Sequence, residues 1–162
     1  MKVWGKSAFA TTFRAMFLLH ALIILTLLIG DQTCWHEWDA KEDSCYKMYN
    51  EKKSWADSQA VCKAERGDLA KLNSEDKTYF VFLNLVKLAN PRSSVWMGLS
   101  RGSDNKFYWP DGGLTEYTNW SPGSPDNSSG NKKNCTKINE FTGLWENEEF
   151  DFTYSFVCGR GK

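Results

Sequence analysis

Oxygen-bearing side chains stand at both ends of one irregular stretch of the sequence, residues 120–145. Asp126 and Asn127 lie near its start, and Glu146 and Asn147 directly follow its end. Carboxylate and carboxamide oxygens hold hard cations and accept hydrogen bonds from sugar hydroxyls. If folding brings these side chains together, the stretch predicts a site for a cation or a carbohydrate. The alternative interpretation is a solvated surface loop with acidic ends, because loops carry such residues by default.

The first part of this stretch is predicted to be a loop. Residues 119–130 are rich in Pro, Gly, Ser and Asn, a composition that disfavours a helix or a paired strand. A long irregular loop inside a compact domain is uncommon and is usually functional.

Two helices and several short strands are predicted around the loop. Ser54 and Ser74 are favourable N-cap residues. The first helix should run to about Arg66, with Gly67 as its C′ residue, and the second should end before Pro91. The expected strands are residues 45–49, 95–99, 107–109, 135–138 and 155–158. Helices early in the chain and strands late indicate an α+β domain.

The first 30 residues are interpreted as a targeting segment. Three basic residues and no acid come before an apolar run from Ala15 to Gly30. A basic region before a short apolar run is typical of a secretory signal peptide, so we expect a secreted, extracellular protein. The alternative is a type II membrane anchor, in which case residues 15–30 hold the protein on a membrane. The absence of a stalk between Gly30 and Cys34 argues against it.

Composition argues against two classes of function, nucleic-acid binding and catalysis, and predicts disulfide bonds. The formal net charge is zero and no basic stripe is present, so a nucleic-acid partner is not expected. All five cysteines follow the apolar run, which predicts a disulfide framework with one thiol left over. His36 is the only imidazole after residue 30, and the sequence has neither a Gly-x-Ser-x-Gly elbow nor zinc-ligand spacing. An enzyme is therefore not expected.

Residues of unlike type form a pattern of fixed order and spacing in the second part of the chain. They are Cys45-Tyr46, Trp55, Ala60, Cys62, Gly67, Leu69, Trp96-Met97-Gly98-Leu99, Trp109-Pro110-Asp111-Gly112, Asn119-Trp120, Pro125, Trp145 and Cys158. This pattern resembles the C-type lectin-like domain family. The resemblance implies a disulfide-stapled α+β domain over residues 34–160, with two helices, small antiparallel sheets and a long ligand-binding loop.

The resemblance also implies how the cysteines are used. Cys62 would pair with Cys158, and Cys34 with Cys45. The position that would pair with Cys135 is occupied by Phe150, so Cys135 is expected to be unpaired. We favour a buried, inert thiol packed against Phe150, since a free cysteine behaves as a small hydrophobe. The alternative is an intermolecular disulfide.

Carbohydrate-binding members of the family hold a calcium ion under the loop, and this sequence departs from their ligand set. The loop tripeptide is Ser124-Pro125-Asp126, with Pro125 expected to be cis. Lys133 stands where an acidic ligand is expected. An ammonium offers only donors and repels a cation, so we expect Lys133 to pair with Asp126 or Glu146 and to weaken calcium binding or abolish it. The predicted carbohydrate-binding residues are Ser124, Asp126, Asn127, Glu146 and Asn147, and the predicted metal ligands are Asp126, Glu146 and Asn147.

Two functions from different classes follow. The first is a secreted carbohydrate-binding protein with a glycan or glycoprotein partner and with its dependence on calcium in doubt. The second is a calcium-independent module that binds a protein ligand.

Three N-glycosylation sequons begin at Asn119, Asn127 and Asn134. An integrin-type tripeptide, Arg66-Gly67-Asp68, is interpreted as the end of a helix.

Overall fold

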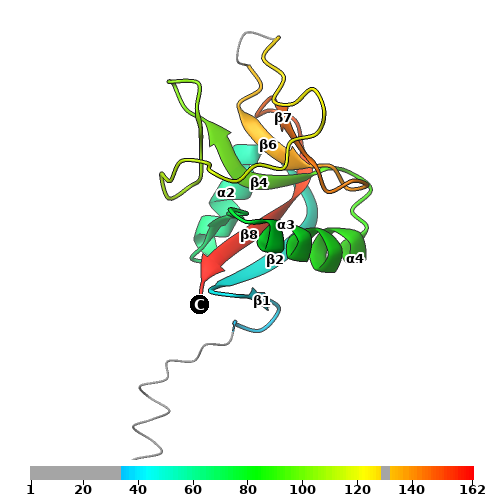
Figure 1. The fold of residues 1–162 in the computed structure, drawn as a ribbon. Helices are drawn as coiled ribbons and strands as arrows, with labels where there is room; N and C mark the ends of the chain where they lie inside the picture. Colours follow the sequence, from blue (N-terminus) through cyan, green and yellow to red (C-terminus); the bar gives the residue numbers. More distant parts are fainter. Residues whose placement is uncertain (1–33, 129–131) are drawn as a thin grey trace, which may run out of the picture. The chain divides into compact units, whose positions relative to one another are not determined.

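The computed structural model describes residues 34–128 and 132–162 (Figure 1). They belong to one compact unit, Cys34–Lys162. The predicted targeting segment, residues 1–30, lies outside the described residues. Within the described part of the chain, no helix is long and apolar enough to span a bilayer.

The helices pack beside a sheet (Figure 1). They are α2 (Trp55–Ala64), α3 (Glu75–Val81), the π-helical turn η1 (Phe82–Val86) and α4 (Lys87–Ala89), the last three in one continuous run. The Ser54 hydroxyl accepts a hydrogen bond from the Asp57 N–H, and the Ser74 hydroxyl accepts one from the Lys77 N–H. Both predicted N-caps are therefore confirmed. The π turn was not predicted.

Eight strands of the described chain form one sheet. They are β1 (Asp39–Lys41), β2 (Ser44–Lys53), β3 (Asp68–Leu69), β4 (Val95–Arg101), β5 (Phe107–Tyr108), β6 (Cys135–Ile138), β7 (Trp145–Glu148) and β8 (Tyr154–Gly161). The order is β1-β2-β8-β4-β6-β7, with β3 paired to β8 and β5 to β4. β4 and β8 run parallel, so the strands join into one mixed sheet instead of separate antiparallel ones.

The end of α2 differs by one residue from the prediction. Arg66, and not Gly67, takes the left-handed conformation, with a φ of 60°. A Cβ atom on Gly67 would lie 2.7 Å from the carbonyl oxygen of Gly159. Glycine is therefore required here because the backbone of β8 passes close by.

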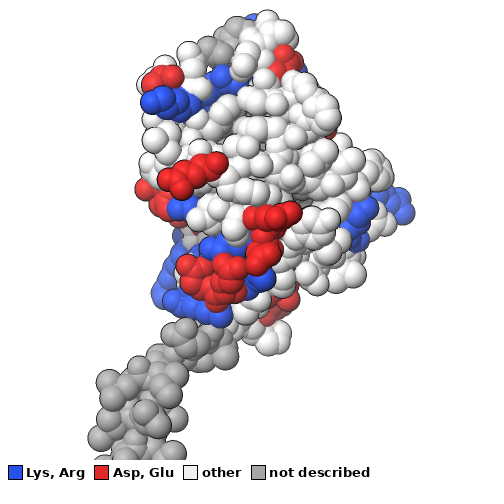
Figure 2. Space-filling model, in the orientation of Figure 1, with Lys and Arg blue, Asp and Glu red and all other residues white. Residues whose placement is uncertain are grey.

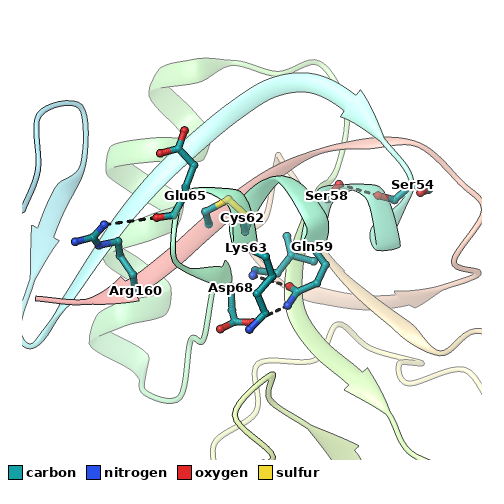
Figure 3. The surroundings of a disulfide bond; sticks show 10 residues. Ser54, Ser58, Gln59, Cys62, Lys63, Glu65, Asp68 and Arg160 are labelled. Carbon is teal, nitrogen blue, oxygen red and sulfur yellow. Dashed lines mark hydrogen bonds and ion pairs between the residues drawn. A yellow bond between two sulfur atoms is a disulfide. The ribbon is translucent and has the colours of Figure 1, made fainter.

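Two disulfides staple the unit: Cys62–Cys158 joins α2 to β8, and Cys34–Cys45 closes the N-terminal hairpin. Beside the first of these, Asp68 accepts a hydrogen bond from Gln59 at 2.6 Å and lies 2.7 Å from the Lys63 ammonium (Figure 3). Gly67 is buried. The tripeptide Arg66-Gly67-Asp68 thus belongs to the helix end and does not present a free carboxylate.

Aromatic rings anchor the long loop to the core. Trp145 on β7 is fully buried. The rings of Trp109, Tyr117 and Trp120 meet it edge-on, with centroid distances of 5.9, 5.6 and 5.8 Å. Each such pair contributes about 0.5–1.5 kcal/mol beyond area burial. The loop therefore leaves β5 and returns to β6 over a fixed aromatic base.

Candidate functional site: the long loop

The long loop, residues 109–134, connects β5 to β6 and is tied to β7 along its course. The Trp145 N–H donates to the Asn119 carbonyl at 2.8 Å, and the Ser121 N–H donates to the Trp145 carbonyl at 2.9 Å. The Ser124–Pro125 peptide bond is cis, as the resemblance implied. The chain beyond it turns back toward β7.

The Asn147 side chain joins the two flanks of the loop tip. It projects from β7 and is 4% exposed. Its Oδ1 accepts from the Asp126 N–H at 2.6 Å, and its Nδ2 donates to the carbonyls of Asp126 and Lys133 at 2.8 and 3.1 Å. Because a carboxamide has two N–H donors, both are used. The predicted ligand oxygen at this position already holds the loop backbone.

An ion pair closes the same loop tip. The Lys133 Nζ lies 2.8 Å from Asp126 Oδ2, and Asp126 Oδ1 accepts from the Ser128 N–H at 2.8 Å. The hydrogen bond from Lys133, followed by those from Ser128, holds the pKa of Asp126 well below its usual range. The same hydrogen bond raises the pKa of Lys133. The ammonium therefore occupies the space beside the loop carboxylate where a metal ion would have to bind.

Glu146 lies on the other face of β7. Successive strand residues point to opposite faces, and here Trp145 and Asn147 are buried while Glu146 and Glu148 are partly exposed. Glu146 accepts a hydrogen bond from Asn139 at 3.1 Å and lies 3.6 Å from the Lys137 ammonium. The structure therefore brings Asn147 to Asp126 and does not bring Glu146 there.

Ser124 and Asn127 complete the exposed side of the loop tip. Ser124 is half-buried, and its hydroxyl lies 3.5 Å from that of Ser121. Asn127 is exposed, and its Oδ1 accepts from Arg101 Nη2 at 2.6 Å. Arg101 was missed at the sequence level. It stands on β4, 26 residues before Asn127, and no local pattern links the two.

The donor set does not suit a divalent cation in this arrangement. Among the residues that the structure describes, no group of three or more His, Cys, Asp or Glu residues lies close enough to hold a metal. One loop carboxylate, Asp126, faces an ammonium, and the carboxamide of Asn147 is bonded to backbone. Calcium sites gain affinity from the charge and number of their oxygen ligands, and both are low here.

Cys135 is a free thiol at the start of β6. It is 4% exposed, in a buried cluster with Trp96 and Phe156. Burial raises its pKa to about 12. The expected packing against Phe150 is wrong, because that side chain is 61% exposed and lies outside the cluster. The strand residues around Cys135 bury the thiol instead.

Comparison with known proteins places these features in a family. The model of the Lectin C-type domain matches residues 51–160. The chain belongs to this family. C-type lectin lectoxin-Lio3 of Erythrolamprus poecilogyrus is 29% identical over 160 residues, which cover 90% of this C-type lectin and 94% of the relative.

Solved structures share the fold. The mouse scavenger receptor C-type lectin carbohydrate-recognition domain is 27% identical, with a TM-score of 0.72 over 80% of this C-type lectin and 99% of that domain. A calcium-independent type II antifreeze protein is 19% identical, with a TM-score of 0.71 over 82% of this chain and 97% of that one. The second likeness shows the fold alone.

Proposed function

We propose that this C-type lectin is a non-catalytic recognition protein that binds a glycan or glycoprotein through its long loop without calcium. The supporting observation is the Lys133–Asp126 ion pair of 2.8 Å at the loop tip. The ammonium supplies the positive charge that a metal would otherwise bring to this carboxylate. The likeness to a carbohydrate-recognition domain supports the ligand class. The calcium-independent antifreeze protein supports only that the fold does not require the metal.

The loop tip keeps hydrogen-bonding capacity for sugar hydroxyls. A carboxylate has about four lone-pair sites, and the contacts of Asp126 with Ser128 N–H and Lys133 Nζ use one on each oxygen. The hydroxyl of Ser124 and the amide of Asn127 add donors and acceptors beside it. Most of the surface over β6, β7 and the loop is uncharged on the face in view (Figure 2). Asn147 acts as a positioning residue, and Glu146 has no place in the proposed contact set.

We also propose secretion. The basic and apolar segment before Cys34 supports it, as do the two disulfides, which persist in oxidising compartments.

A glycan array probed with the purified protein, in millimolar calcium and in EDTA, tests the proposed function. We expect the same glycans to be bound to the same extent in both buffers. Asp126→Ala should abolish the signal, and Asp151→Ala, at an exposed turn between β7 and β8, should leave it unchanged. Binding that disappears in EDTA would refute the calcium-free mechanism. Absence of any bound glycan would refute the ligand class.

A thermal melt gives an independent test of the metal. A ligand that binds only the native state raises stability by about 2.7 kcal/mol at a hundredfold excess over its Kd. We expect no shift of the midpoint between millimolar calcium and EDTA. A clear rise with calcium would show that the loop releases Lys133 and binds the ion.

An exposed apolar corner favours a second candidate, a protein-binding module. Leu88 on α4 is 77% exposed and Phe141 is 74% exposed, and the Lys87 ammonium donates to the Phe141 carbonyl at 3.1 Å. Clustered exposed apolar side chains are typical of protein contacts. An array of extracellular proteins probed with wild type and Phe141→Ser would test it. A partner bound equally by both proteins would argue against this corner.

A further inference from the structure

The three sequons lie in different environments. The first begins at Asn119, which is half-buried within the long loop. Its Nδ2 donates to the Gly143 carbonyl at 3.1 Å, and the next residue, Trp120, packs against Trp145. A glycan on this nitrogen would replace one of its two hydrogens and would have to fit beside this hydrogen bond and the aromatic base of the loop. This half-buried amide is therefore a poor acceptor in the folded protein.

The second environment is the entry to β6. Asn134 is half-buried and its Oδ1 is buried. Its backbone N–H and carbonyl are bonded to Lys132 and Arg101. The other two sequon residues, Cys135 and Thr136, are 4% and 0% exposed. N-linked glycans are bulky and belong to surface positions, so this segment is a poor acceptor in the folded protein.

Asn127 stands apart from these two. It is exposed, and so is the next residue, Ser128. Its Oδ1 accepts from Arg101 Nη2 at 2.6 Å, and no described residue accepts a hydrogen bond from its Nδ2. Because Arg101 orients the carbonyl end of the amide, the nitrogen end is left toward solvent. A glycan on this nitrogen costs no contact described in the structure.

We propose that Asn127 is the N-glycosylated residue of this protein and that its glycan covers the ligand-binding face of the loop. Asn127 directly follows Asp126, so a bound oligosaccharide would occupy the space that an incoming sugar needs. The covering of the ligand-binding face rests on the proposed function, whereas the glycosylation of Asn127 does not. Glycosylation would then regulate recognition, with only the bare loop open to ligand.

The modification is a group transfer from a lipid-linked oligosaccharide diphosphate, the donor class of the secretory pathway. A bond forms between Nδ2 of Asn127 and the anomeric carbon of the donor. The bond from that carbon to the diphosphate oxygen breaks, and the lipid diphosphate leaves with the electron pair. Nδ2 loses one proton. The product keeps the amide carbonyl, so Oδ1 still accepts from Arg101.

Site occupancy is the direct test. The full chain is secreted from a eukaryotic cell line, digested, and treated with a glycoamidase that converts each occupied asparagine to aspartate. Peptide mass spectrometry then reads the three sequons in one sample. We expect conversion at Asn127 and not at Asn119 or Asn134. Conversion at either of the others with Asn127 unmodified, or no conversion at any of them, would overturn the assignment.

The covering effect is tested with a matched pair of variants. Ser129→Ala removes the sequon and keeps the Asn127 side chain, whereas Ser129→Thr, at the same position, keeps the sequon. On a glycan array we expect the Ser129→Ala protein to bind about tenfold more tightly than wild type, and the Ser129→Thr protein to match wild type. Equal binding by glycosylated and bare forms would overturn the covering effect. If Asn127 is occupied and neither form binds, the proposed function fails while the modification stands.

Discussion

Replacing Asn147 with alanine should loosen the loop tip and lower the free energy of unfolding by about 3 kcal/mol. The change removes three hydrogen bonds of 2.6, 2.8 and 3.1 Å from a side chain that is 4% exposed. Each is worth about 1 kcal/mol net. The backbone N–H and carbonyl of Asp126 and the carbonyl of Lys133 would lose their partner.

Thermal unfolding measures the size of this effect. For a domain of this size, a loss of 1 kcal/mol lowers the midpoint by about 4 °C, so we expect a fall of about 12 °C. Amide exchange gives the local readout, because the Asp126 N–H should exchange faster than the global loss of stability requires. Asn73→Ala is the matched control. Asn73 is exposed, no described residue bonds to its side chain, and its substitution should stay within about 0.5 kcal/mol.

A second substitution of Asn147 separates the role of its Nδ2 donor from that of its Oδ1 acceptor. Asn147→Asp keeps the shape and the acceptor oxygen but turns a second oxygen toward the two backbone carbonyls. We expect a large loss of stability at neutral pH that lessens on acidification, since a protonated carboxyl again donates one hydrogen bond. If Asn147→Ala and Asn73→Ala melt within about 4 °C of each other, Asn147 does not hold the loop. The argument that its Oδ1 is already used by the loop backbone, and so is not available to a metal, then fails.

Three further outcomes are expected. Replacing Lys133 with Gln should raise the pKa of Asp126 in an NMR titration. Because the folded pKa is depressed, the stability difference from wild type should be complete above the unfolded pKa and fade as pH falls through the folded one; an unchanged Asp126 titration would contradict the ion pair. Lys133→Glu should create or tighten a calcium site by placing a second carboxylate beside Asp126, and calorimetry without any gain in affinity would show the ligand placement to be wrong. Cys135 should resist a thiol reagent in the native protein and react on unfolding, because its raised pKa leaves little thiolate. A non-reducing gel with a quantitative dimer that vanishes in Cys135→Ser would contradict the buried monomeric thiol.

Local signals predicted the helix starts, since a serine N-cap acts within three residues of itself. Ser54 and Ser74 show this directly. The predicted end of α2 was wrong by one residue because Gly67 is required by a tertiary contact and not by the helix end. Gly67 faces the backbone of Gly159, which is 92 residues further along the chain. Nothing near Gly67 in sequence reveals that contact.

The candidate site was predicted in composition but not in arrangement. Glu146 and Asn147 were treated as neighbours in one ligand set, yet β7 turns them to opposite faces. Burial alternates with a period of two from Trp145 to Glu148, but three of these four residues are polar, so the alternation is not visible in the residue types. The partners of Asn147 lie 14 and 21 residues away, and only the register of the fold defines them.

The Cys62–Cys158 disulfide also decides how the unit would carry a mechanical load. Lys162 donates to the Asp43 carbonyl, and Ser44 pairs with Gly161, so the two ends of the unit lie side by side. Tension applied there would unzip the end of β8 from β2 one hydrogen bond at a time until it reached the covalent cross-link. Force would then run from Cys62 straight to Cys158 and bypass the 95 residues between them. The long loop lies inside that closed ring, so the load would not pass along its backbone.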